Sequence, residues 1–227
     1  MRVAGESSYT GSVRSGGPAG VRELEHVVIR KASVSAMDND CYLLSCRATG
    51  AQLLIDAADD ATRLLGLVHE GAPDGRLDQV VTTHQHWDHH RALRDVIAAT
   101  GADSAAGAED ASGLPVMPDR LLAQGDSVQF GEIALSVIHL RGHTPGSVAL
   151  VYHDPSGTPH IFTGDSLFPG GVGRTTTPED FDSLIDDVET RVFGTLPDET
   201  WVYPGHGDDT TLGAERPSLP EWRERRW

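Results

Sequence analysis

Short apolar runs alternate with amphipathic stretches along the chain, and both fall into two groups. Apolar runs bounded by Gly, Pro, Asn or Asp predict β-strands. The predicted strands are residues 24–29, 41–46, 52–55 and 79–83 in the first half, and residues 127–130, 133–140, 148–152, 160–163 and 201–203 in the second. Because helical spacing follows the strands in each half, the pattern predicts an α/β or α+β fold built as a layered sandwich.

Helical spacing of apolar residues occurs over residues 58–70, over residues 91–100 and in a stretch that opens at Thr177. Thr177 is a good N-cap, and Pro178 suits the first helical position. The expected buried stripes are Ala61, Leu64, Leu65 and Val68 in the first helix and Phe181, Leu184, Ile185 and Val188 in the last.

A chain of 227 residues suits one large domain or two small ones. Residues 1–22 are rich in Gly and Ser and lack the apolar core of a secretory signal peptide, so we expect a flexible N-terminal tail there. We expect the domain itself over residues 23–213. In the C-terminal tail, residues 214–227, Trp222 and Trp227 stand among arginines, and this tail could dock on the domain, cover a pocket or mediate contact in a homodimer.

The formal net charge of −16 narrows the choice of partners. An acidic surface repels phosphate backbones and anionic lipids, so we expect neither nucleic acid nor a membrane as a partner. The two cysteines, Cys41 and Cys46, stand an odd number of residues apart in a predicted strand and therefore point to opposite faces. We expect two reduced core thiols and a cytoplasmic protein.

The strongest chemical signal is the segment His84-Gln85-His86-Trp87-Asp88-His89, which directly follows a predicted strand. Further Gly- or Thr-rich segments carry His143, Asp165 and His206. Histidines and aspartates gathered in turns in this way form a ligand set for two metal ions. Imidazole and carboxylate ligands without cysteine suit Zn first, with Fe or Mn as alternatives.

The spacing divides these residues between two ions. Alternation along an extended chain points His84 and His86 to one side, while Asp88 and His89 aim at a second point as the turn tightens. The first ion is expected on His84, His86 and His143, and the second on Asp88, His89 and His206. Asp165 is the natural bridge, since one carboxylate can bind both ions.

Such a pair of ions indicates hydrolysis. Two metals about 3.5–4 Å apart lower the pKa of a bridging water to near 7, so hydroxide is available at neutral pH. The hydroxide would attack an electrophilic carbonyl, and Asp88 would orient it as well as bind metal. The set therefore predicts a metal-dependent hydrolase.

In order and spacing, the ligand set resembles that of the metallo-β-lactamase superfamily. The match comprises the segment 84–89 and then His143, Asp165 and His206. The resemblance extends over about residues 24–213 and implies a four-layer αββα sandwich with a dinuclear site at the sheet edges. Residues 23–213 would then be a catalytic domain of this fold.

Within the superfamily the chain is most similar to the glyoxalase II branch, because Asp165 stands where true β-lactamases typically carry cysteine. Residues 162–174 resemble the glyoxalase II and persulfide dioxygenase pattern, and residues 205–207 and 210–213 resemble it as well. The resemblance also implies that Asp56 is the family's buried aspartate behind the metal ligands. The alternative for Asp56 is a cap at the end of a strand.

Two departures from glyoxalase II concern the substrate. Full-length glyoxalase II has a helical C-terminal domain that helps bind glutathione, whereas only residues 207–227 follow the last ligand here. Arg174 stands where glyoxalase II has a lysine near the glutathione carboxylate, and Thr176 stands near a position where it has a tyrosine. Both are therefore candidate substrate contacts. The chain looks more like the short, single-domain bacterial hydrolases of this branch, which implies a thioester or small ester as substrate.

Other functions stay open. A persulfide dioxygenase would use one iron held by His84, His143 and Asp165, a set of two histidines and one carboxylate. A lactonase would use the same hydrolytic chemistry, and a non-catalytic protein would keep the metals for stability or redox sensing. The acidic charge and the absence of an added domain disfavour a nuclease of the RNA-processing branch.

Overall fold

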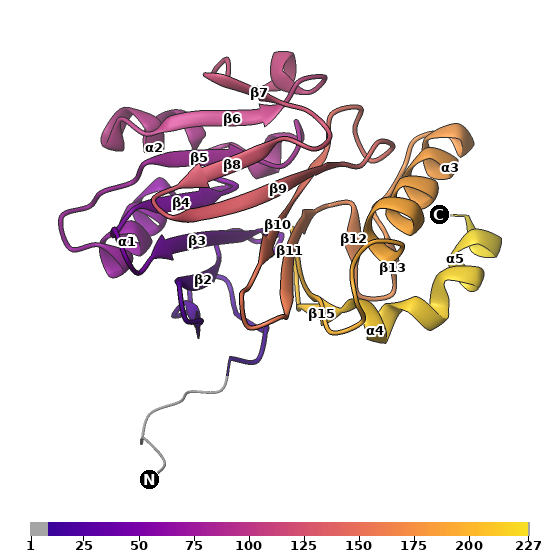
Figure 1. The fold of residues 1–227 in the computed structure, drawn as a ribbon. Helices are drawn as coiled ribbons and strands as arrows, with labels where there is room; N and C mark the ends of the chain where they lie inside the picture. Colours follow the sequence, from indigo (N-terminus) through magenta and orange to yellow (C-terminus); the bar gives the residue numbers. More distant parts are fainter. Residues whose placement is uncertain (1–8, 227) are drawn as a thin grey trace, which may run out of the picture.

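Two β-sheets lie face to face in the computed structural model, which describes residues 9–226 (Figure 1). The first sheet has the strand order β1 (Gly20–Glu23), β2 (Val27–Ser33), β3 (Asp40–Cys46), β4 (Gln52–Ile55), β5 (Gln79–Thr82), β6 (Asp103–Gly107) and β7 (Arg120–Leu122). The second has the order β15 (Thr210–Thr211), β14 (Trp201–Pro204), β11 (Pro159–Gly164), β10 (Val148–His153), β9 (Ile133–His139) and β8 (Ser127–Phe130). A separate ribbon pairs β12 (Leu167–Phe168) with β13 (Gly171–Val172).

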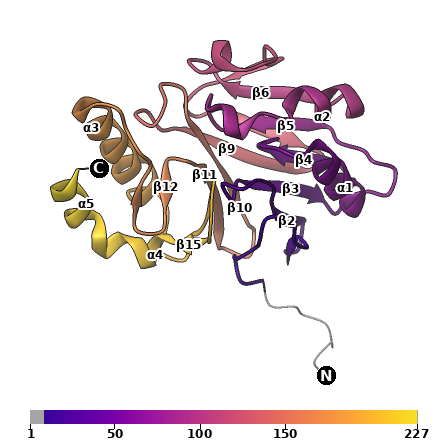
Figure 2. The same ribbon diagram turned by 180° about the vertical axis from the view of Figure 1, so that it is seen from behind.

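Helices cover the outer face of each sheet (Figures 1 and 2). The first sheet carries α1 (Ala61–Gly71) and α2 (Leu93–Thr100). The second carries α3 (Pro178–Asp187), its wide-turn continuation Val188–Phe193, α4 (Leu212–Glu215) and α5 (Leu219–Arg225). The order helix, sheet, sheet, helix confirms the predicted αββα sandwich.

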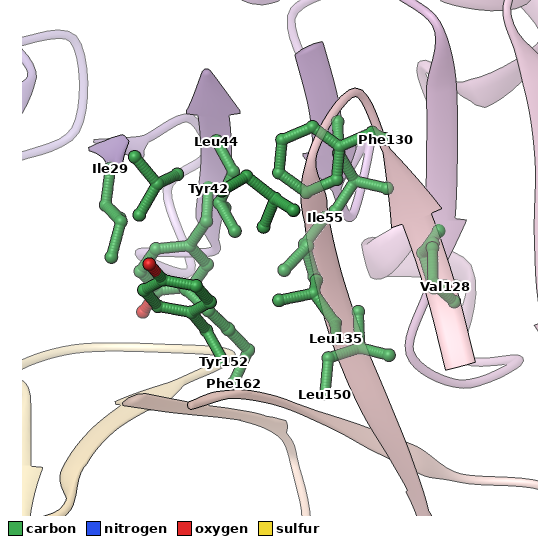
Figure 3. Packing of buried hydrophobic residues seen from close by; sticks show 14 of the residues in the cluster. Ile29, Tyr42, Leu44, Ile55, Val128, Phe130, Leu135, Leu150, Tyr152 and Phe162 are labelled. Carbon is green, nitrogen blue, oxygen red and sulfur yellow. The ribbon is translucent and has the colours of Figure 1, made fainter. Parts of the chain in front are cut away.

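Three apolar layers hold the sandwich together. The central layer lies between the sheets, and Figure 3 shows Ile29, Tyr42, Leu44 and Ile55 of the first sheet near Leu150 and Phe162 of the second. The two outer layers pack each sheet against its own helices. Alternating side chains of one strand thus serve different layers: Cys46 belongs to the central one and Cys41 to an outer one. Both thiols are free and buried, as predicted.

The sheet topology places several loops at one edge. Strands β4, β5, β6 and β7 run parallel to one another, so their carboxyl ends point the same way. In the second sheet, β11 and β14 are parallel, and the turn between the antiparallel strands β9 and β10 lies next to their carboxyl ends. Ligands of α/β proteins commonly bind beyond the carboxyl ends of such strands.

Most predicted elements are confirmed, and the differences have physical causes. The bounds of the predicted strand 24–29 are wrong. The chain turns after β1, and β2 runs from Val27 to Ser33. Lys31 lies beyond the predicted end of this strand, yet its side chain is fully buried within β2. In α1, Leu67 is buried in place of the predicted Leu65, whereas Leu64 and Val68 are buried as expected.

Both expected tails pack on the domain where the structure describes them. Residues 9–22 are not a flexible tail: Tyr9 donates a hydrogen bond to Asp209, and β1 pairs with β2. Residues 1–8 of the expected tail lie outside the described residues. At the other end, Trp222 of α5 is 2% exposed in the outer layer beside α3, so this part of the C-terminal tail docks on the domain. Within residues 9–226, no helix has the length and apolar character that crossing a bilayer requires.

A buried histidine predicts acid sensitivity of the fold. His160 is 2% exposed, and the hydroxyl oxygen of Tyr203 lies 3.0 Å from its Nδ1 atom. Burial and the charge of Arg22 lower the pKa of His160 to about 4. Because this value lies below the ordinary one of about 6.5, stability that is fully present above pH 6.5 should fall by about 3 kcal/mol as the pH drops to 4. Urea unfolding of metal-free protein should show this loss, and His160→Phe should remove the part that His160 causes; an equal loss in the variant would contradict the assignment.

Candidate metal centre

Four loops meet at the edge where strands of both sheets end. Seven predicted ligands lie on these loops: His84, His86, Asp88 and His89 after β5, His143 between β9 and β10, Asp165 after β11, and His206 after β14. A short helical turn, Trp87–His89, tightens the chain just after the two alternating histidines. Strands distant in sequence therefore bring the predicted ligands to one place.

The donor atoms form overlapping groups in which they lie within 4.8 Å of one another. The groups are His84 with His86 and His143, His84 with His89 and Asp165, and Asp88 with His89 and His206. Asp165 reaches both outer groups, since its Oδ2 atom lies 3.6 Å from His143 Nε2 and 3.5 Å from His206 Nε2. That is the position a bridging carboxylate requires.

Hydrogen bonds behind the rings determine which nitrogen two of the histidines present. His143 Nδ1 lies 2.7 Å from the carbonyl oxygen of Arg174, and His206 Nδ1 lies 2.8 Å from that of Met37. A carbonyl oxygen can only accept, so each Nδ1 carries a proton. In the neutral ring the Nε2 atom then holds a lone pair, and both Nε2 atoms face Asp165.

The donor set fits cations. His89 Nε2 lies 3.2 Å from His206 Nε2, and His86 Nδ1 lies 2.9 Å from His143 Nε2. Facing lone pairs repel one another unless a proton or a metal ion lies between them. Among the residues described, the buried His84 Nε2 has no hydrogen-bond partner, as expected of an atom directed at a metal. Imidazole and carboxylate donors in this arrangement suit Zn, Fe or Mn.

The electrostatics of the site favour positive charge around Asp165. Burial alone would raise the pKa of Asp165, but the neighbouring histidines, His89 above all, hold it well below its usual range. Burial lowers the pKa of His89, and the Asp165 carboxylate more than offsets this, raising it to about 10. Burial and the adjacent His89 lower the pKa of His84 well below its usual value, so the ring is neutral, as metal binding requires.

Gly205 leaves room for the ligands to approach one another. A Cβ atom at this position would lie 2.2 Å from Asp165 Oδ1 and 2.8 Å from the His89 ring. Both separations are shorter than atoms tolerate, so a side chain here would displace two ligands. The lack of a side chain at Gly205, directly before His206, therefore has a steric reason.

Asp56 lies behind the ligands, and it also caps a strand end. Its Oδ2 atom accepts from His89 Nδ1 over 2.9 Å and from Thr83 Oγ1 over 2.8 Å, and its Oδ1 atom accepts from Thr83 N over 2.7 Å. The Thr83 hydroxyl, having donated to Asp56, can only accept from His84 Nδ1, 3.0 Å away. Asp56 thus directs the Nε2 atoms of both His84 and His89 into the site.

Asn39 is a site residue that the sequence did not reveal. It is fully buried at the start of β3, and its side-chain amide donates to Asp88 Oδ2 over 3.0 Å. Its backbone also pairs with that of His206. Asn39 therefore joins two ligands of one group. No motif marked it, because its partners stand 49 and 167 residues away.

Asp110 is a second buried residue that the sequence did not reveal. Its Oδ2 atom accepts from Gln85 N over 3.0 Å and from Thr144 Oγ1 over 2.5 Å, while its Oδ1 atom accepts from Gly146 N over 2.7 Å. One carboxylate thus ties the loop of His84 and His86 to the loop of His143. A single aspartate without another candidate ligand close to it in the sequence carries no signal of such a role.

The two predicted substrate contacts lie in a pocket of about 460 Å³ beside His143. The pocket is lined by Arg174, Thr175, Thr176, Thr177, Pro178, Phe181 and Arg226. The Thr176 hydroxyl donates to Asp180 at the start of α3, and Arg226 pairs with Asp182. The exposed Arg174 side chain has no ion pair with the described residues, so its guanidinium is available to a ligand.

Comparison with known proteins agrees with this geometry. The sequence model of the metallo-beta-lactamase superfamily matches residues 36–206. A hydroxyacylglutathione hydrolase of Fuscovulum blasticum is 37% identical over 171 residues, which cover 74% of this chain and 62% of the relative. The hydroxyacylglutathione hydrolase GloC of Haemophilus influenzae is 31% identical over 206 residues, covering 82% of this chain and 94% of the relative.

A solved structure shows the same fold with metal present. The protein TTHA1623, crystallised in a di-iron-bound form, superposes with a TM-score of 0.68 and is 32% identical, with 84% of this chain and 98% of that chain covered. The chain spans 62% of the length of the Fuscovulum relative but nearly the whole of GloC. The match over residues 36–206 and these identities show that the chain belongs to the metallo-beta-lactamase superfamily.

Proposed function

We propose that the protein is a metal-dependent hydrolase of the glyoxalase II type, which cleaves thioesters or small esters. Two divalent ions, Zn first, would be held by His84, His86 and His143, by Asp88, His89 and His206, and by the bridging Asp165. The observation that carries the proposal is the position of Asp165, whose Oδ2 atom lies within 3.6 Å of a histidine from each outer group. Relatives named hydroxyacylglutathione hydrolase support the thioester class.

Asp88 is the residue we assign to the attacking water. When bound, the two ions supply a hydroxide nucleophile at neutral pH and stabilise the developing oxyanion. Burial tends to raise the pKa of Asp88, but the hydrogen bond from Asn39 helps to lower it below the usual value, so the group is a carboxylate at neutral pH. It can orient the water and accept a proton from it. Hydrolysis then adds the elements of water across the acyl–sulfur or acyl–oxygen bond and releases an acid with a thiol or an alcohol.

The direct test is a substrate panel on zinc-loaded protein. Glutathione thioesters, simple esters and lactones would be compared by initial rate, together with the metal content per chain. We expect about two ions per chain and thioesters as the best substrates. A protein with two ions that turns over lactones but not thioesters would replace this proposal with a lactonase.

Arg174 should determine affinity for anionic substrates. Its guanidinium forms no ion pair within residues 9–226 and borders the pocket beside His143, so it can form a charge-assisted hydrogen bond with a carboxylate of the leaving group. We expect Arg174→Ala to raise KM for glutathione thioesters by about tenfold or more, with a small change in kcat. The backbone carbonyl that supports His143 remains in this variant.

Steady-state kinetics on charged and uncharged thioesters measure this effect. Arg120→Ala is the matched control, because Arg120 is an exposed arginine outside the pocket. An equal change in KM for charged and uncharged thioesters would exclude Arg174 as the anion contact.

A mononuclear iron dioxygenase is the second candidate. His84 shares one donor group with His143 and another with Asp165, and His143 Nε2 lies 3.6 Å from Asp165 Oδ2, so two histidines and one carboxylate are together. The di-iron form of a relative shows that this fold accepts iron. One iron per chain with oxygen uptake on glutathione persulfide, and no thioester turnover, would establish this alternative.

A further inference from the structure

A fully buried lysine lies beneath the loop that carries His206. The ammonium group of Lys31 donates to the carbonyl oxygens of Gly11 and Gly207 over 2.8 and 2.6 Å, and to Asp209 Oδ1 over 2.6 Å. Asp40 Oδ2 lies 3.1 Å away and is a second carboxyl oxygen beside the ammonium. A buried ammonium is tolerated only when its protons have acceptors, so these four groups and Lys31 form one unit, which we call the lysine clamp.

The loop is held on both sides of His206, and the lysine clamp holds the side that follows it. Before His206, the backbone N–H of Asp40 donates to Gly205 O over 2.8 Å. After it, Lys31 binds Gly207 and Asp209. Both flanks are thus fixed to β2 and β3, and the position of the flank after His206 depends on Lys31.

Asp209 is itself held from a third direction. Its Oδ2 atom accepts from the Tyr9 hydroxyl over 2.7 Å and from Trp201 Nε1 over 2.8 Å. The segment around Tyr9 and Gly11 therefore contacts both Asp209 and Lys31 of the clamp. Lys31, Gly11, Gly207 and Asp209 all lie outside residues 36–206, the part that the superfamily model matches. Apart from Asp40, the clamp is thus built by residues outside that range and not by the ligand motifs.

We infer that Lys31 is a positioning residue for the second metal site, because it sets the distance of His206 from Asp88 and His89. This inference rests on the dinuclear site proposed above. The hydrogen bond from His206 Nδ1 to Met37 O fixes how the ring is turned, and the clamp fixes where its backbone lies. The first site uses His84, His86 and His143, whose loops Lys31 does not contact, so its affinity is independent of the clamp.

The test is the binding of metal to Lys31→Met, which keeps the length of the side chain and removes its charge. Equilibrium dialysis with Zn²⁺, and the absorption bands of Co²⁺-loaded protein, would measure each binding step without any assay of activity. We expect the first ion to bind as in the wild type and the second to bind at least about tenfold more weakly. Two ions bound with wild-type affinities by folded Lys31→Met would overturn the inference.

Gln52→Leu is the matched control. Gln52 is fully buried in the same sheet and donates to the carbonyls of Val68 and Arg76, at the end of β4 away from the metal loops. It should lower stability and leave both binding steps unchanged. If Gln52→Leu weakens the second ion as much as Lys31→Met, the effect is general loosening and the inference fails.

Two milder variants cover the case in which Lys31→Met does not fold. Asp209→Asn removes one counter-charge and Tyr9→Phe removes one hydrogen bond to it, so the second ion should weaken more in the first variant than in the second. Wild-type affinity in folded Asp209→Asn would overturn the inference. Wild-type protein that binds two ions but hydrolyses no ester or thioester would reject the proposed function and leave the clamp standing, whereas wild-type protein without a second ion would reject both.

Discussion

Replacing Asp165 by alanine should remove the bound metals and lower thioester hydrolysis by at least about a thousandfold, or about 4 kcal/mol of transition-state stabilisation. The Asp165 carboxylate is the group that approaches both outer sets of histidines. Without it, the nitrogen atoms of His89, His143 and His206 converge on a point that has lost its negative charge. Metal content by elemental analysis and kcat/KM on a glutathione thioester measure the two effects.

The control for this change is a carboxylate remote from the loops. Asp154 is buried in the turn between β10 and β11, at the opposite end of β11 from Asp165. Asp154→Ala should cost stability and keep both ions and the rate per folded molecule. Full activity with two ions in Asp165→Ala would remove the bridging assignment and with it the main support for a dinuclear hydrolase.

The fold was predictable because its signals are local. Apolar runs ended by turn residues marked β3, β4, β8 and β10 to within a residue, and Thr177 with Pro178 marked the start of α3, where Asp180 N donates to the Thr177 hydroxyl. The candidate ligands could be proposed for a similar reason, and the structure brings them together. Closely spaced histidines in one turn can be recognised without knowledge of distant residues, so the segment 84–89 alone indicated metal binding.

What the sequence concealed depends on contacts between distant residues. No neighbour of Lys31 in the sequence indicates that it is buried, because the acceptors of its ammonium group come from residues 11, 207 and 209. The segment from residue 9 to residue 22 looked like a tail because its Gly and Ser content is that of an unstructured chain, and its contacts, such as Tyr9 with Asp209, span 200 residues. Asn39 and Asp110 stood alone between unremarkable neighbours, and only the folded chain shows what each one binds.

These concealed residues share one physical task. Histidine rings can present either nitrogen, and loops can shift by more than a metal site tolerates, so the ligands alone do not define the geometry. Asp56 directs rings, Asn39 joins two ligands, and Lys31 and Asp110 hold loops. A ligand motif therefore indicates that metal binds, while the buried polar residues behind it determine how closely the donor atoms meet.

Replacement of Asp110 should have the second large effect, on stability and on metal binding. Asp110→Ala should lower the free energy of unfolding of the metal-free protein by about 3–5 kcal/mol, because Gln85 N, Gly146 N and the Thr144 hydroxyl would lose a buried, charged acceptor. The same change should weaken the first metal site, since the loops of His86 and His143 are no longer tied together. Urea unfolding and zinc binding measure both consequences.

Asp119→Ala is the control, because it removes a carboxylate near β6 that does not join the two metal-binding loops. Asp119 accepts from the backbone and the hydroxyl of Ser104 and contacts no metal loop. Its replacement should lower stability less than Asp110→Ala does, because Asp119 is exposed and water can take its place, and should leave zinc affinity unchanged. If Asp110→Ala proved as stable as Asp119→Ala and bound zinc normally, the link between the two loops would rest on their backbone packing, and the carboxylate would have no part in holding the site.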